Sequence, residues 1–237
     1  MKAPLSIIFI LSTVFCFGQS DSTSSKREIR VMIISSPDYT YRLSTPKVPN
    51  ESDKPALRYR LGVDIEYELR KKLFLKSGVR YVCSGYLYVP PDWSKLTFGD
   101  FIDIRTNLVY DPWNEEIATF NQNDFYYHEI EIPLAIKYYP LKTGFNINAG
   151  ISCQYLFNTT ETIPLKSGQT TTLANHNFTK YILSTNLGIG YDFLISSEFI
   201  LSLNPVFRLN LTNSCVGSYF DEKIYSAGLE FGIGKMF

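Results

Sequence analysis

The residues of this sequence that could act as catalysts are few and far apart. There are two histidines, His128 and His176. His128 directly precedes Glu129, and consecutive residues of a strand point to opposite faces, so these two cannot form a catalytic pair within one strand. His176 lies in a threonine-rich stretch, and no G-x-S-x-G motif supplies a nucleophile. The sequence therefore favours a protein that is not an enzyme, with a lipid-modifying enzyme that uses His176 as the alternative.

Cysteine spacing gives no metal or cofactor motif. There are four cysteines, and no two of them form a C-x-x-C pair. Their long and irregular spacing fits neither a zinc site nor a disulfide framework, and the three after residue 19 allow at most one bridge. We therefore expect neither a cofactor nor a metal.

The segment from 90 to 125 is the strongest candidate for a binding site. It contains both tryptophans of the chain and seven acidic residues. A connection of this length is usually functional or disordered, and its aromatic residues argue against disorder. Trp and Tyr anchor protein interfaces, so we expect it to dock another protein, with an ordered lid as the alternative. The candidate contact residues are Trp93, Phe98, Asp100, Phe101, Asp103, Tyr110, Trp113, Glu115 and Glu116.

The elements that position these segments are strands, because apolar and polar residues alternate with a period of two. The clearest example is Phe145 to Phe157, where every second residue is apolar or aromatic. Pro205 interrupts another such run and predicts a bulge or a broken ladder. The same pattern predicts eight strands, at about 28–43, 58–69, 73–89, 126–140, 144–157, 179–194, 197–211 and 222–237.

The connections between these strands alternate between tight turns and long loops. No apolar stretch after the first twenty residues is long enough for a spanning helix, so any membrane crossing must use strands. The sequence therefore predicts an all-β fold: an eight-stranded antiparallel up-and-down transmembrane β-barrel with short periplasmic turns and long extracellular loops. Both chain ends are then expected on the periplasmic side. A soluble β-barrel or sandwich is the competing interpretation.

Charged residues stand in the middle of the predicted strands, opposite clean apolar faces. In a membrane barrel the charged face is the interior, and buried charges persist when they are paired. An eight-stranded interior is just wide enough to be filled by side chains, which argues against an open pore, although a narrow channel remains the alternative. We expect an interior network, paired across neighbouring strands, of Glu66, Lys76, Arg80, Glu129, Glu131, Lys137 and Arg208.

The amino terminus has the layout of a secretory signal. Lys2 is followed by the apolar run from Leu5 to Phe17 and by Gly18. We expect a signal peptide at 1–19, a short segment at 20–27 and a barrel domain at 28–237. The whole chain has 23 basic and 23 acidic residues, so it lacks the basic excess that nucleic-acid binding requires.

Four stretches carry a resemblance to a known family: 75–81, 127–139, 148–151 and 232–237. In these the chain resembles the outer-membrane β-barrel family common in Bacteroidetes, which includes the PorT-like proteins. The resemblance implies a protein integral to the outer membrane of a Gram-negative bacterium, surrounded by lipids and lipopolysaccharide. From the charged interior and the 90–125 segment we expect a structural or accessory subunit of an outer-membrane complex, related to secretion or assembly, with a protein partner in that membrane or at the cell surface.

Overall fold

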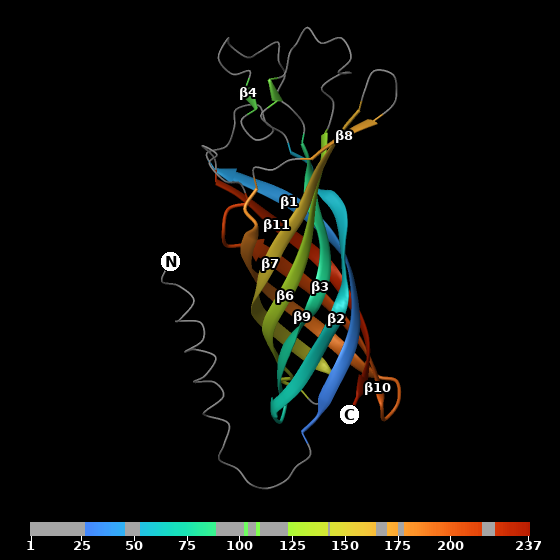
Figure 1. Cartoon of the computed structure of the whole chain (residues 1–237). Coiled ribbons are helices and arrows are strands. Elements are labelled where there is room, and N and C mark those ends of the chain that lie inside the picture. The colour runs from blue at the N-terminus through green and yellow to red at the C-terminus, as the bar shows by residue number, and fades with distance from the viewer. Residues whose placement is uncertain are drawn as a thin grey trace.

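The computed structural model consists of strands and their connections (Figure 1). It describes residues 27–45, 53–88, 102–103, 108–109, 123–141, 143–164, 170–174, 178–214 and 221–237. Among these residues, no helix is long and apolar enough to cross a membrane. The long strands are β1 (Ile29–Thr45), β2 (Ala56–Arg70), β3 (Leu73–Tyr88), β6 (Asn123–Tyr138), β7 (Phe145–Pro164), β9 (Tyr181–Leu194), β10 (Phe199–Asn210) and β11 (Asp221–Met236).

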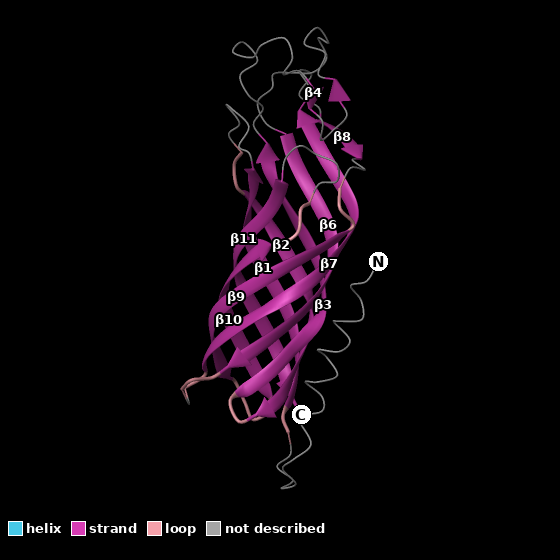
Figure 2. Ribbon diagram, turned by 90° about the vertical axis from the view of Figure 1, so that its left-hand side faces the viewer, coloured by secondary structure: helices cyan, strands magenta, loops and turns pink. Residues whose placement is uncertain are grey.

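These eight strands close into a barrel in which every neighbouring pair is antiparallel (Figure 2). Each strand pairs with the next one in the chain, and β1 closes the wall by pairing with β11. At this seam the Phe237 amide donates to the Ile29 carbonyl at 2.8 Å. The predicted eight-stranded antiparallel up-and-down barrel is confirmed. Its short connections, 71–72, 139–144 and 195–198, lie at one end, and the strand ends that the longer connections join lie at the other.

Three short strands were not predicted. They are β4 (Ile102–Asp103), β5 (Leu108–Val109) and β8 (Thr170–Ala174). The first two pair with each other, and β8 pairs with the end of β7, which runs to Pro164 rather than ending near 157. Alternation of apolar and polar residues reports a wall that has two different environments on its two sides. These short strands leave no such signature because they are not part of the barrel wall.

Pro205 in β10 coincides with a gap in one ladder, as its missing amide predicts. Its neighbour β11 pairs continuously there, with Pro205 opposite Leu229. On the β9 side the pairing passes from Leu203 directly to Val206. A proline has no N–H to donate, so only one of its two neighbouring strands can be fully bonded.

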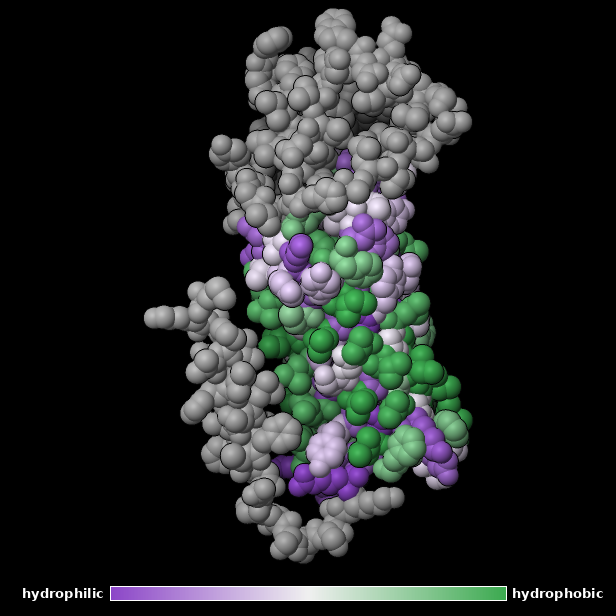
Figure 3. All heavy atoms as spheres, viewed as in Figure 1, coloured by the Kyte–Doolittle hydropathy of each residue, from purple (hydrophilic) through white to green (hydrophobic). Residues whose placement is uncertain are grey.

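The wall sorts its side chains in the opposite sense to a soluble barrel. Along β2 the outward Leu57 and Val63 are 66% and 47% exposed, whereas the inward Arg60 is 4% exposed. The apolar residues form a band over the outside of the wall, with hydrophilic residues below and above it (Figure 3). Aromatic contacts lie on this outer surface, including Tyr155–Tyr181 at 5.4 Å and Tyr191–Phe193 at 4.6 Å between ring centroids. This is the surface that a lipid-facing barrel requires.

Candidate functional site

The middle of the barrel is filled by a cluster of ion pairs that we call the central cluster. It has four cations and four carboxylates, all buried: Arg60, Lys76, Arg80, Arg208, Asp38, Asp64, Glu131 and Glu230. Glu230 is its hub. Its carboxylate accepts Lys76 Nζ at 2.6 Å, Arg80 Nη1 at 3.0 Å and Arg208 Nη2 at 3.0 Å.

The other carboxylates of the central cluster are shared in the same way. Asp38 lies between Arg60 Nε at 2.5 Å and Arg208 Nη1 at 3.0 Å. Asp64 lies between Arg80 and Lys76, at 2.5 and 3.1 Å. Arg60 also reaches Glu131 at 2.9 Å. Equal numbers of opposite charges, each with at least one partner, are what allows ions to remain buried.

A second cluster lies nearer the short connections. Lys137 Nζ donates to Glu66 at 2.9 Å and to Asp192 at 2.8 Å. Arg30 Nη1 lies 3.3 Å from the same Asp192 carboxylate, which the Tyr139 hydroxyl also contacts. The cluster therefore ties β1, β2, β6 and β9 together at this end of the barrel.

A third cluster lies toward the long connections. Arg42 pairs with Asp53 at 2.5 Å and with Glu222 at 3.3 Å. Asp53 precedes β2 and lies outside the spanning strands, and burial raises its pKa to about 6 although the Arg42 guanidinium opposes this shift. The Tyr127 hydroxyl donates to Glu222 at 3.0 Å. Beside it is an apolar group of Tyr86, Tyr88, Phe125, Tyr127, Leu156, Phe178 and Ile224.

The structure places all seven residues of the expected network in the interior, but it pairs them differently from the sequence expectation. Glu66 and Lys137 are the one pair formed within the expected set among the described residues. Some pairs join neighbouring strands, such as Arg80 on β3 with Asp64 on β2, and others cross the lumen, such as Arg80 with Glu230 on β11. Glu129 has no ion pair with the described residues and accepts only the Ser84 hydroxyl, at 3.4 Å.

Several interior charges were missed, chiefly on β1 and β2. Arg30, Asp38 and Arg42 all lie on the inward face of β1, at even-numbered positions. Arg60 lies on the inward face of β2. The signal was the same alternation that located the strands. The same alternation, extended along the first two strands, would have identified these four residues.

Little free space remains between these side chains. Two interior voids of about 10 Å³ each lie beside Arg208 in the described part of the barrel. A void of this size holds at most about one water molecule. The described interior is therefore a packed polar plug.

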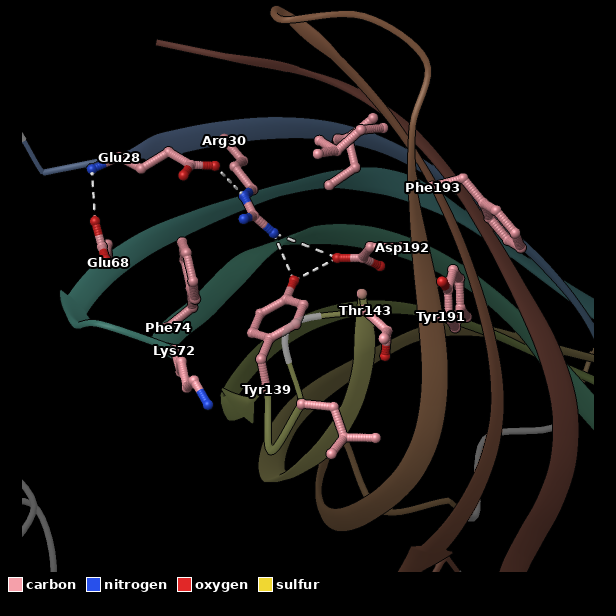
Figure 4. Close-up of a pocket in the computed structure, with 14 residues that line it drawn as sticks. Glu28, Arg30, Glu68, Lys72, Phe74, Tyr139, Thr143, Tyr191, Asp192 and Phe193 are labelled. Carbon is pink, nitrogen blue, oxygen red and sulfur yellow. Dashed lines mark hydrogen bonds and ion pairs between the residues drawn. The ribbon is translucent and has the colours of Figure 1, made fainter.

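A cavity of about 540 Å³ lies at the end with the short connections (Figure 4). Arg30, Phe74 and Asp192 line its inner part, where Arg30 Nε contacts Glu28 at 2.5 Å. At its rim Lys72 donates to the Pro140 carbonyl at 3.1 Å. The sequence did not predict this cavity, because residues of two separate connections and of several strand ends create it. We call it the mouth cavity.

The expected partner-binding residues of 90–125 lie outside the residues whose side chains the structure describes, as does His176. Of that set only the backbone of Asp103 is described, paired with Leu108. His128 lies on the outer face, with its Nδ1 2.7 Å from the Tyr81 hydroxyl. Among the described residues, no group of acidic, histidine or cysteine side chains could hold a metal ion, and Cys83 and Cys153 are free thiols.

Comparison with known proteins gives matches consistent with this architecture. Residues 17–214 match the model of the family described as outer membrane protein beta-barrel domain. None of the curated proteins compared with the chain matches it.

Several solved barrels are similar to the chain. Neisserial surface protein A is 8% identical with a TM-score of 0.40, covering 88% of this chain and 97% of that one. Ail, the attachment invasion locus protein of Yersinia pestis, is 9% identical with a TM-score of 0.42, covering 90% and 100%. A major outer membrane protein of Thermus thermophilus is 11% identical with a TM-score of 0.47, covering 88% and 99%.

Proposed function

The chain belongs to the outer membrane protein β-barrel domain family, and from that premise we propose that it is a non-enzymatic structural or accessory subunit of an outer-membrane complex, related to secretion or assembly. It is an outer-membrane β-barrel protein of a Gram-negative bacterium. We also propose that it belongs to the Bacteroidetes outer-membrane barrels, the family that includes the PorT-like proteins, and that it has a cleaved signal at 1–19 and chain ends in the periplasm. The proposal also adds a partner in the outer membrane or at the cell surface.

The observation that carries this proposal is the filled interior. Eight cross-linked charges occupy the middle of the barrel, and the voids beside them are about 10 Å³. A pore must offer a continuous aqueous path, whereas this interior offers ion pairs whose separation would leave buried charges uncompensated. We therefore place the function of this protein at the two ends of the barrel, which we call its rims, rather than in its interior.

The segment 90–125 is the part of the long-connection rim that we propose to dock a partner. Its base is fixed, because β3 and β6 pair continuously from Arg80 opposite Glu131 up to Tyr88 opposite Asn123. A connection that leaves and re-enters the wall at neighbouring positions is presented by a rigid support. Its tryptophans, tyrosine and carboxylates are the residue types that a docking segment needs.

The test compares partners captured from detergent extracts by the wild type and by a deletion of residues 92–122. We expect a protein that accompanies the wild type to be absent from the deletion. A heat-modifiable gel shift for both forms shows that the barrel is folded. Identical partners in the two captures would remove the docking role.

Two further measurements address the class of protein. Planar bilayers that contain the purified barrel should show no conductance steps, and regular steps would contradict the plugged interior. Mass spectrometry of lipid A from a deletion strain should match that of the parent strain. A modification lost with the gene, and lost again in His176→Ala, would instead support a lipid-modifying enzyme.

A further inference from the structure

The mouth cavity joins two different environments. Its inner lining is charged and buried, with Arg30 and Asp192 8% and 5% exposed. Its outer lining includes Phe193, which is on the lipid-facing surface of β9 and is 45% exposed. Figure 4 shows Arg30 and Asp192 directed at one another and Phe193 directed away from them. A cavity with a polar interior and an apolar outer edge suits an amphiphilic ligand.

The opening arises from unequal strand lengths. β7 begins at Phe145, opposite Tyr191, whereas β9 continues to Leu194. Beyond Tyr191, these two segments meet at Asp192, whose amide donates to the Gly144 carbonyl at 3.0 Å and whose carboxylate accepts Asn146 Nδ2 at 3.3 Å. The ladder between β7 and β9 therefore stops before β9 ends. This leaves an opening in the wall beside the end of β9, at the membrane edge of the barrel.

The polar part of the cavity presents both signs of charge. Arg30 uses Nε and Nη1 for its contacts, and Nη2 has no partner among the described residues. Lys72 stands exposed at the rim. Glu68 accepts the Glu28 amide at 3.2 Å and has no ion pair among the described residues. Two cations and two partly free carboxylates suit a ligand with a zwitterionic head group, which carries one negative and one positive charge.

We propose that the mouth cavity binds one zwitterionic phospholipid whose head carries a primary ammonium. The phosphate lies toward Arg30 and Lys72, the ammonium lies toward Glu28 and Glu68, and an acyl chain follows the exposed side of Phe193. An anionic lipid is disfavoured because the lining has three carboxylates against two cations. This site is separate from the partner-docking rim and stands or falls independently of it.

The test uses the full barrel in nanodiscs of equal parts phosphatidylethanolamine and phosphatidylglycerol, followed by native mass spectrometry of the released protein. The wild type should retain one phosphatidylethanolamine about tenfold more often than one phosphatidylglycerol. Glu68→Gln and Lys72→Ser should each lower phosphatidylethanolamine retention about tenfold, the effect of losing one charge-assisted hydrogen bond.

The matched controls are Glu198→Gln and Lys235→Ser. These residues form an exposed pair at 3.3 Å, at the same end of the barrel but outside the lining of the cavity. They should leave retention unchanged, and a heat-modifiable gel shift confirms that all four variants are folded. Equal retention of the two lipids by the wild type would overturn the proposal. A preference that survives Glu68→Gln, or that falls equally in the controls, would also overturn it.

Discussion

Replacing Glu230 by alanine is expected to be among the most damaging single changes in this protein. Its carboxylate lies within 3.0 Å of three cationic groups and is buried. Its removal leaves the central cluster with four cations and three carboxylates. Breaking a buried ion pair by deleting one partner costs about 3–5 kcal/mol, which lowers the folding equilibrium constant by a factor of about 100 to 5,000.

The destabilisation arises from unbalanced buried charge, so restoring the balance should restore part of the stability. Arg208→Ala alone leaves three cations and four carboxylates, and it should also be strongly destabilising. The double variant has three cations and three carboxylates. In it Asp38 keeps Arg60 as its partner, and Asp64 keeps Lys76 and Arg80. We expect the double variant to be more stable than the sum of the single losses by about 2 kcal/mol.

The assay is reversible urea unfolding of the barrel in lipid vesicles, with the free energy of unfolding taken from linear extrapolation. Glu198→Ala serves as the control, because its partner Lys235 is exposed and a surface pair contributes less than about 1 kcal/mol. Two results would refute the reasoning. One is a loss below about 1 kcal/mol in Glu230→Ala, and the other is strict additivity in the double variant.

Four further substitutions test the interior by the same unfolding measurement. Because the pKa of Asp53 is raised from 3.8 to about 6, the folded state holds a proton there that the unfolded chain releases, so the free energy of unfolding should fall as pH rises through about 6. Asp53→Asn should remove that fall, and an unchanged pH profile would exclude this source. Glu129→Gln should change stability by less than about 1 kcal/mol, whereas Glu131→Gln, which weakens a buried ion pair, should cost about 3 kcal/mol; equal losses would contradict this ranking. Gly85→Ala should cost at least about 2 kcal/mol, because Gly85 has φ +130° and an added Cβ would lie 1.9 Å from the Phe125 carbonyl oxygen; a neutral substitution would show that the wall relaxes there.

The barrel itself could be predicted from the sequence because its signal repeats in every strand. Each spanning strand has lipid on one side and a polar plug on the other, so inward Arg60 and outward Leu61 report the wall directly. The strand ends were predicted to within a few residues for most of the wall, and β7 was the main exception.

The pairing inside the barrel could not be predicted in the same way. Lys76 reaches Glu230, which is 154 residues away, because the tilt and stagger of the strands bring β3 and β11 to one level in the lumen. Alternation within a strand reports which side a residue faces, but not its height along the barrel axis. The mouth cavity was missed for a related reason, since it depends on where β7 and β9 end relative to each other.

The alternation of charged inward and apolar outward side chains also determines how much an error in strand register would cost in the membrane. A strand displaced by one residue would turn its charged face to the lipid and its apolar face to the plug. On β2 that slip would bring Arg60, Asp64 and Glu66 into hydrocarbon together, and each basic side chain at the bilayer midplane costs about 2–4 kcal/mol. Misaligned barrels would thus be rejected by the bilayer itself. The charged residues that form ion pairs in the folded barrel thereby also favour the correct strand register during insertion.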